Sequence, residues 1–250
     1  RSMGHATGPA ALPCAGAALY SCSAVRPRRV SDPGETTAPA EGAGNRSAPH
    51  TGEPTVPTIA IVSHSGFGHT RRIAEQIAEA ARASAHAPDV KLFHLEDSEP
   101  DWDALDNAEC IVMGCPTYMG MPSAGFKAFA EASSGRWMKR AWLNKLAAGF
   151  TNSGSLHGDK QNTLVALLTL AAQHGMVWIT QAELATPRDG EHGGKPDDPN
   201  RMGASIGLMA QSDNRSPDEA PSPGDLETAR RFGQRIAEIT AHWTLANKPA

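Results

Sequence analysis

The stretch Ile59-Ala-Ile-Val-Ser-His-Ser-Gly-Phe-Gly-His-Thr70 decides how this chain folds. It begins as an apolar run rich in β-branched residues, typical of a buried strand, and ends in a short turn of glycines and polar residues. From Arg71 onward, Ile73, Ile77 and Ala81 recur at the spacing of one helix face. The order strand, tight loop, helix brings backbone N–H groups and the positive end of a helix dipole to one point. The stretch therefore predicts an anion-binding loop.

Three kinds of anion loop are compared with this stretch. A Walker loop is excluded because no Lys-Ser or Lys-Thr pair follows the glycines. A dinucleotide fingerprint requires a third glycine three residues after Gly68, and Arg71 stands there instead. A cradle for a single phosphate fits better, since Ser65 and Thr70 supply hydroxyl groups while Gly66 and Gly68 let the backbone come close. The simplest alternative is an ordinary turn in which Thr70 is the helix N-cap.

Composition excludes several classes of protein. The net charge of −4 gives no basic surface for nucleic acid or an anionic membrane, and no apolar run reaches the length of a transmembrane helix. The four cysteines, Cys14, Cys22, Cys110 and Cys115, show no disulfide or metal-ligand spacing, and the histidines are likewise scattered. We therefore expect no metal site and a cytoplasmic location, where thiols stay reduced.

The chain divides into two parts by composition. Residues 1–56 are rich in Ala, Gly, Pro, Ser and Thr without periodicity, which predicts a disordered leader. Residues 57–250 are long enough for one domain with a sizeable core.

Strand and helix patterns alternate through the second part. Such alternation predicts a doubly wound α/β fold, with a parallel sheet covered on both faces by right-handed crossovers. The final helix has a clear start, with Ser222 as N-cap and Pro223 in its first turn. Residues 181–222 are too long and too rich in Gly, Pro, Asp and Asn for an ordinary connection, so a functional or poorly ordered loop is expected there. The expected strands are 58–63, 89–95, 110–114, 145–150 and 175–180, and the expected helices include 70–85, one starting at Pro122, and 162–174.

Two further polar loops follow the third and fourth expected strands. The first reads Pro116-Thr-Tyr-Met-Gly120, which offers a hydroxyl, flat or polarisable apolar surface and a glycine, as a planar heterocycle requires. The second reads Thr151-Asn-Ser-Gly-Ser155, a run of small polar residues suited to a polyol chain or a pyrimidine edge. In open α/β sheets ligands bind beyond the carboxyl ends of the strands. We therefore expect the three loops to converge on one ligand.

Together these motifs resemble a known family. Ser65 to Thr70, Pro116 to Gly120, Gly135-Arg-Trp137, Phe150 to Gly154 and Leu170-Ala-Ala-Gln-His-Gly-Met-Val177 resemble the flavodoxin-like NAD(P)H:quinone oxidoreductases of the WrbA type, over about residues 58–245. The resemblance implies a flavodoxin-like five-stranded parallel sheet of order 2-1-3-4-5. It also implies flavin mononucleotide (FMN) as cofactor, NADPH or NADH as reductant, a quinone or similar acceptor, and a homo-tetramer or homo-dimer.

The resemblance also implies roles for individual residues. A tryptophan and a histidine that match Trp137 and His174 line the cavity over the flavin in that family, contributed across subunits, so these two are the catalytic candidates. The chain departs from the family at Tyr118, Met119 and the Leu156-His-Gly-Asp159 run, and Arg71 with Arg72 would add positive charge beside a phosphate. The cofactor-binding candidates are Ser65, Phe67, Gly68, His69, Thr70, Pro116, Thr117, Tyr118, Met119, Gly120, Thr151, Asn152, Ser153, Gly154 and Ser155.

Two functions from different classes remain open at this stage. One is an enzyme that passes two electrons from NAD(P)H to quinones. The other is an electron-carrier flavodoxin, which binds FMN but has no small-molecule substrate. Carriers are typically shorter and more acidic, so the extra length at 181–222, the modest charge and Trp137 favour the enzyme. The sequence leaves open the acceptor, the choice between NADH and NADPH, the oligomeric state and the purpose of residues 1–56.

Overall fold

The computed structural model describes residues 56–185 and 194–247, so the expected leader 1–56 lies outside the described residues except for its last residue. The strands are β1 (Thr58–Ser63), β2 (Asp89–His94), β3 (Cys110–Tyr118), β4 (Met121–Pro122), β5 (Leu146–Ser153), β6 (Val177–Trp178) and β7 (Leu208–Gln211). The helices are α1 (His69–Arg82), α2 (Trp102–Asn107), α3 (Ala124–Ala132), α4 (Ser134–Lys139), α5 (Lys160–Gln173) and α6 (Pro223–Ala246).

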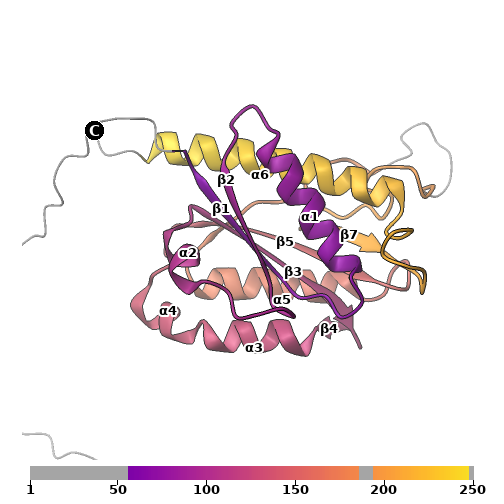
Figure 1. Ribbon diagram of the computed structural model, residues 1–250, viewed down its shortest axis with the longest axis horizontal. Coiled ribbons are helices and arrows are strands. Elements are labelled where there is room, and N and C mark those ends of the chain that lie inside the picture. The colour runs from indigo at the N-terminus through magenta and orange to yellow at the C-terminus, as the bar shows by residue number, and fades with distance from the viewer. Residues whose placement is uncertain (1–55, 186–193, 248–250) are drawn as a thin grey trace, which may run out of the picture. The chain divides into compact units, whose positions relative to one another are not determined.

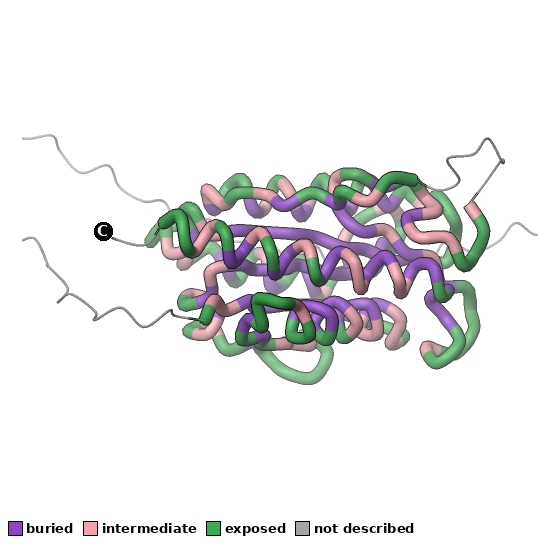
Figure 2. The backbone as a smooth tube through the Cα atoms, turned by 90° about the horizontal axis from the view of Figure 1, so that it is seen from above, coloured by how far each residue is buried: buried purple, intermediate pink, exposed green. Residues whose placement is uncertain are grey.

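The sheet has the predicted order. Its parallel strands run β2-β1-β3-β5-β6, which is the flavodoxin-like order 2-1-3-4-5 once the short hairpin strand β4 is set aside. The central strands are apolar along their length because both faces are covered, and Ile59 to Val62 are fully buried. The edge strand β2 alternates between exposed and buried residues at its start, as its sequence predicts. Figure 2 shows buried backbone along the strands and exposed residues on the outer sides of the helices.

Helices cover the two faces of the sheet in separate groups. In Figure 1, α1 and α6 lie together on one side of the strands, while α3, α4 and α5 lie on the other. Ile73 and Ile77 of α1 pack with Phe232 and Ile236 of α6 in one apolar core. The second core, on the opposite face, gathers side chains of α3, α5 and the buried Trp142. Among the described residues, no helix is both long and apolar enough to cross a membrane.

The region after β3 differs from the prediction. β3 continues to Tyr118 because its last two residues pair antiparallel with β4 in a tight hairpin. The hairpin turn has left-handed backbone at Met119 (φ 49°) and Gly120 (φ 76°). Pro122 therefore belongs to a strand, and α3 begins two residues later, after Ser123. The short helix α4 was not predicted.

The fifth strand position is shared by two short segments. β6 pairs with the start of β5, and β7 pairs with its end, both in parallel. The expected strand 175–180 is thus shorter than predicted, since the chain leaves the sheet after Trp178 and returns at Leu208. The unusually long stretch 181–222 therefore contains a strand of the sheet as well as loop. The start of α6 matches the prediction, with the Ser222 hydroxyl accepting from the Asp225 N–H.

The crossing of α1 and α6 gives a test of this packing. A methyl group at Gly233 would overlap the carbonyl oxygen of Ile77, so we expect Gly233→Ala to lower the free energy of unfolding by about 1–3 kcal/mol. The control is Gly135→Ala in α4, where an added Cβ meets no atom within 4 Å, and which should leave stability unchanged or slightly raised. Urea denaturation measures both. Equal stabilities for the two variants would contradict close helix packing at Gly233.

Candidate functional site

The carboxyl ends of β1, β3 and β5 open onto one cavity of about 500 Å³, here called the strand-end cavity. The parallel register sets this convergence, since Ser63 pairs with Gly114 of β3, and Gly114 in turn pairs with Phe150 of β5. All three loops expected to meet do meet. The residues that line the cavity are Ser65, Phe67, His69, Thr70, Pro116, Thr117, Tyr118, Asn152, Ser153, Gly154, Ser212, Asp213, Asn214, Arg215, Ser216 and Pro217.

The first loop ends in an uncapped helix N-terminus. α1 follows Gly68, which adopts left-handed backbone (φ 88°), and no side chain caps its first turn. The alternative that Thr70 is the N-cap is therefore wrong, because Thr70 lies inside the first turn with its side chain buried at the cavity. The first turn also carries no acidic residue. A helix end of this kind leaves N–H groups and a partial positive charge for an anion.

Neither arginine after this loop lines the cavity. Arg71 is turned toward β2, where its Nε lies 3.3 Å from Glu96 and its NH2 group pairs with Asp97. Arg72 donates to the carbonyl oxygen of Pro217. The positive charge expected beside a phosphate is thus used in structural contacts. Glu96 also accepts from the Ser65 N–H at 3.0 Å, which anchors the first loop to the end of β2.

The second loop contributes a buried hydroxyl network and an aromatic pair. The Thr117 hydroxyl lies 2.8 Å from that of Thr151, which donates to the Cys115 carbonyl oxygen. Thr151 is therefore a buried support of the second loop and not part of the cavity wall. Phe67 and Tyr118 meet edge to face at the mouth of the cavity, with ring centroids 6.4 Å apart. Burial raises the pKa of the Tyr118 phenol.

Some candidates lie outside the cavity lining. Met119 is fully exposed at the tip of the hairpin, and Gly120 forms the turn beside it. Gly68 shapes the first loop without lining the cavity, and Ser155, at the end of the third loop, does not line the cavity either.

Asn152 of the third loop does line the cavity. It is held in place by the Ser212 hydroxyl, which donates to its Oδ1 at 3.0 Å.

A fourth loop, Ser212–Pro217, completes the cavity and was missed by sequence reasoning. Two side chains of α1 hold it, because the His69 Nε2–H donates to the Arg215 carbonyl oxygen at 2.8 Å and Arg72 donates to Pro217. Within the loop, hydrogen bonding from Arg215 lowers the pKa of Asp213. The signal was available in the sequence as a polar run directly after the apolar Leu208-Met-Ala segment. The expectation of one long loop over residues 181–222 leaves no strand there for a fourth loop to follow.

A buried ion pair anchors the fourth loop from behind. Arg201 donates from Nε and NH2 to the two carboxylate oxygens of Asp225 at the start of α6, each at 3.0 Å. Asp225 also accepts from the Gln211 N–H at 2.9 Å, and the Gln211 amide donates to the Gly154 carbonyl oxygen at 3.0 Å. This network joins the third loop, the end of β7 and the start of α6 through hydrogen bonds, so the third and fourth loops share one buried anchor.

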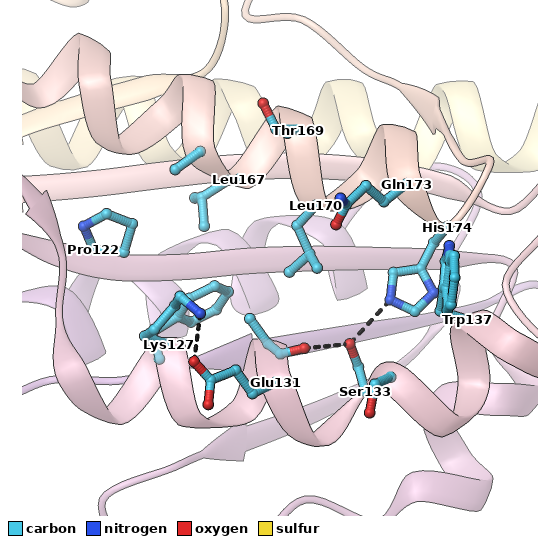
Figure 3. Close-up of a pocket in the computed structure, with 14 residues that line it drawn as sticks. Pro122, Lys127, Glu131, Ser133, Trp137, Leu167, Thr169, Leu170, Gln173 and His174 are labelled. Atoms are coloured by element: carbon cyan, nitrogen blue, oxygen red, sulfur yellow. Dashed lines mark hydrogen bonds and ion pairs between the residues drawn. The ribbon is translucent and has the colours of Figure 1, made fainter. Parts of the chain in front are cut away.

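The two catalytic candidates line a different cavity, of about 570 Å³, between α3, α4 and α5, here called the helix-side cavity. Figure 3 shows Trp137 and His174 beside each other at one end of it. The Ser133 hydroxyl donates to the Ala130 carbonyl oxygen, so the His174 Nε2, 3.0 Å away, carries the proton and donates to Ser133. Burial lowers the pKa of His174. Within one chain, the strand-end and helix-side cavities share no lining residue.

Comparisons with known proteins agree on one family. Residues 59–191 match the family of NADPH-dependent FMN reductases. The chain is 41% identical over 181 residues to flavodoxin FldP of Pseudomonas aeruginosa (strain UCBPP-PA14), covering 72% of this chain and 94% of that protein. It is 28% identical over 207 residues to the NAD(P)H dehydrogenase (quinone) of Gluconacetobacter diazotrophicus, covering 73% of this chain and 96% of that protein. Among solved structures, a WrbA-like flavodoxin from Agrobacterium tumefaciens matches with 39% identity and a TM-score of 0.58, covering 74% of this chain and 98% of that one.

The buried ion pair behind the cavity can be tested directly. Asp225 is 1% exposed, so Asp225→Asn leaves the Arg201 guanidinium with an uncompensated charge and should destabilise the fold by about 3–5 kcal/mol. Asp213→Asn is the matched control, because its pair with Arg215 is exposed and should contribute nothing measurable to stability. Chemical denaturation measures the free energy of unfolding of both variants. An Asp225→Asn protein as stable as the wild type would show that the Arg201–Asp225 pair is dispensable for stability.

Proposed function

The chain belongs to the NADPH-dependent FMN reductase family as a flavodoxin-like protein of the WrbA type, and from that premise we propose that it transfers two electrons from NAD(P)H to quinones through bound FMN. The observation that carries the proposal is the strand-end cavity, where three hydroxyl-bearing loops meet an uncapped helix N-terminus.

The residues of the cavity fit the parts of FMN. The first turn of α1, with the hydroxyls of Ser65 and Thr70, offers donors for a phosphate that needs several at once. The Ser212 hydroxyl donates to the side-chain amide oxygen of Asn152, so the NH2 group of Asn152 is left to donate to a ligand. A bulky residue is excluded at Gly66, since a Cβ there would lie 2.5 Å from the Tyr118 hydroxyl. The groups that line the cavity therefore suit a ligand made of a phosphate, a polar chain and a flat ring.

When bound, FMN accepts a hydride from the nicotinamide and supplies two electrons to an acceptor. The chain's own residues bind and orient it. Phe67 and Tyr118 give the cavity mouth an apolar wall that limits access of water. The fourth loop forms a further part of the cavity wall, and His69 holds it in place.

His174 and Trp137 enter this proposal as residues contributed by a second copy. They lie on the helix-side cavity, so they meet the FMN of another chain only in a homo-oligomer, a tetramer or a dimer as the family resemblance implies. Trp137 is about half exposed and so has surface to offer to such a partner. His174 is 4% exposed and its Nε2 proton is donated to Ser133, so it would act by fixing Ser133 where α3 meets α4, and Trp137 is the member of the pair that can face an acceptor. We also propose a cytoplasmic location, since Cys110 and Cys115 are both buried free thiols.

A second candidate function is an electron carrier. The relative that is 41% identical is named a flavodoxin, and this supports FMN binding without a nicotinamide reaction. The relatives named NAD(P)H dehydrogenase (quinone) support the enzyme, with lower identity over a similar share of the chain.

Removal of the phosphate donors tests the cofactor site. Ser65→Ala and Thr70→Ala should each weaken FMN binding by about 1–3 kcal/mol, because each removes one donor to a charged group. Thr244→Ala, which changes a threonine near the end of α6, is the control. Flavin fluorescence during titration measures the Kd. Unchanged affinity in both site variants would refute the phosphate cradle.

Anaerobic mixing with NADPH and with NADH separates the enzyme from the carrier. The purified protein should be yellow, and as an enzyme it should lose flavin absorbance rapidly with one or both nucleotides and regain it with a stoichiometric amount of benzoquinone. Dithionite provides the control for full reduction. Bleaching by dithionite without bleaching by either nucleotide would establish the carrier instead.

A further inference from the structure

Lys160 is a buried lysine in a place that a helix disfavours. It is the first residue of α5, where the helix dipole is positive, yet its side chain is fully buried. Burying an ammonium group costs free energy unless hydrogen bonds replace its water. The residue before it, Asp159, has left-handed backbone (φ 53°) and does not cap the helix with its side chain. The first turn of α5 therefore offers the Lys160 ammonium group no acidic partner, and its hydrogen bonds lead to a neighbouring segment.

The hydrogen bonds of Lys160 all go to one short loop. Its Nζ donates to the carbonyl oxygens of Ser155, Leu156 and His157, at 2.6, 3.0 and 3.4 Å. An ammonium group has three N–H donors, and here three consecutive carbonyl oxygens receive them. The carbonyl oxygens of residues 155–157 are thus held together by the ammonium group of Lys160.

This loop is joined directly to the wall of the strand-end cavity. The carbonyl oxygen of Ser155 accepts both from Lys160 and from the hydroxyl of Ser153, which lines the cavity. Gly158, at φ 54°, packs so close to Ser153 that a Cβ there would overlap the hydroxyl oxygen. The shape of the loop therefore sets the position of the Ser153 hydroxyl.

The groups that surround Lys160 make its charge sensitive to pH. Burial lowers the pKa of Lys160 to about 8, Asp225 of α6 opposes this by raising it, and Arg201 lowers it further. The side chains of His157 and Asp159, on the loop itself, are exposed. Tyr118 is the phenol at the cavity, and burial raises its pKa above the ordinary value, away from this range.

We propose that Lys160 is a positioning residue for the cofactor site: its ammonium group holds the carbonyl oxygens of residues 155–157 so that Ser153 and Gly154 stand correctly at the cavity wall. This rests on the proposed function, because the ligand whose binding reports the effect is FMN.

The proposal predicts opposite effects of pH on binding and on stability. A neutral amine has only two N–H donors and turns a lone pair toward a carbonyl oxygen, so the loop should loosen as the pH rises through about 8. Global stability should not fall in the same range. The unfolded chain, with an ordinary lysine pKa of about 10.4, binds more protons between about pH 8 and 10, so this group makes the fold more stable as pH rises there.

The experiment measures the Kd of FMN by flavin fluorescence from pH 6.5 to 9, with urea denaturation at the same pH values. Wild-type protein should bind FMN about tenfold more weakly at pH 9 than at pH 7 without losing stability. Lys160→Met should bind weakly at both pH values, with no pH step. Lys160→Gln keeps uncharged N–H donors, so its affinity for FMN should lie between those of the wild type and Lys160→Met, and it should also show no change in affinity with pH. Hydrogen exchange of residues 154–159 should be faster in both variants.

Lys145→Met is the matched control. Lys145 is partly buried, and burial lowers its pKa as it does that of Lys160. It donates to the Ala108 carbonyl oxygen, but it precedes β5 at the end away from the cavity. It should follow the wild type in affinity and pH profile. Wild-type affinity and loop exchange in Lys160→Met, or a pH step that persists in Lys160→Gln, would overturn the proposal. If wild-type protein binds no FMN at any pH, the proposed function fails, and hydrogen exchange of the loop still decides the role of Lys160.

Discussion

The parallel hydrogen bonding of β1 to β2 and β3 is the constraint on which the rest of the structure depends. It fixes the register so that Ser63 lies beside His94 on one side and Gly114 on the other. The neighbouring strands β1, β3 and β5 therefore present their carboxyl ends at one edge of the sheet, and the loops that follow them meet there. Chemistry at this edge needs only short polar loops, because the sheet supplies their positions.

The second requirement is a closed polar wall around that edge, and it is met by buried charges. Arg201 and Asp225 join the returning strand β7 to α6, and Gln211 carries the connection to Gly154 of the third loop. Lys160 similarly holds the residues that follow the third loop, with the main-chain carbonyl oxygens of Ser155 and Leu156 as partners. Charges buried in this way cost free energy, and one use of such groups is to specify a single geometry. Here that geometry belongs to the strand-end cavity.

Several features of the fold and site follow from local pattern alone. The strand at Ile59 to Val62, the helix stripe of Ile73 and Ile77 and the capped start of α6 are each encoded within a few residues, so periodicity and capping chemistry predict them. Three of the four loops at the cavity were found because each directly follows an expected strand. The family resemblance supplied the strand order, FMN and NAD(P)H, and the comparisons agree with it.

Other features depend on contacts between distant segments. β7 is too short to be predicted from its own sequence, and it is a strand only because β5 provides its hydrogen-bonding partner. The loop that follows β7, the fourth loop of the cavity, therefore cannot be predicted from local sequence. The side chain of Thr151 is turned inward because the neighbouring strand β3 offers the Cys115 carbonyl oxygen. The sequence by itself determined the alternation of strands and helices, and with it the edge where a ligand binds, because both are local. Tertiary structure alone decided which hydroxyls face the cavity, where the fourth wall stands and which loop Lys160 holds, because these depend on hydrogen bonds between residues far apart in the chain.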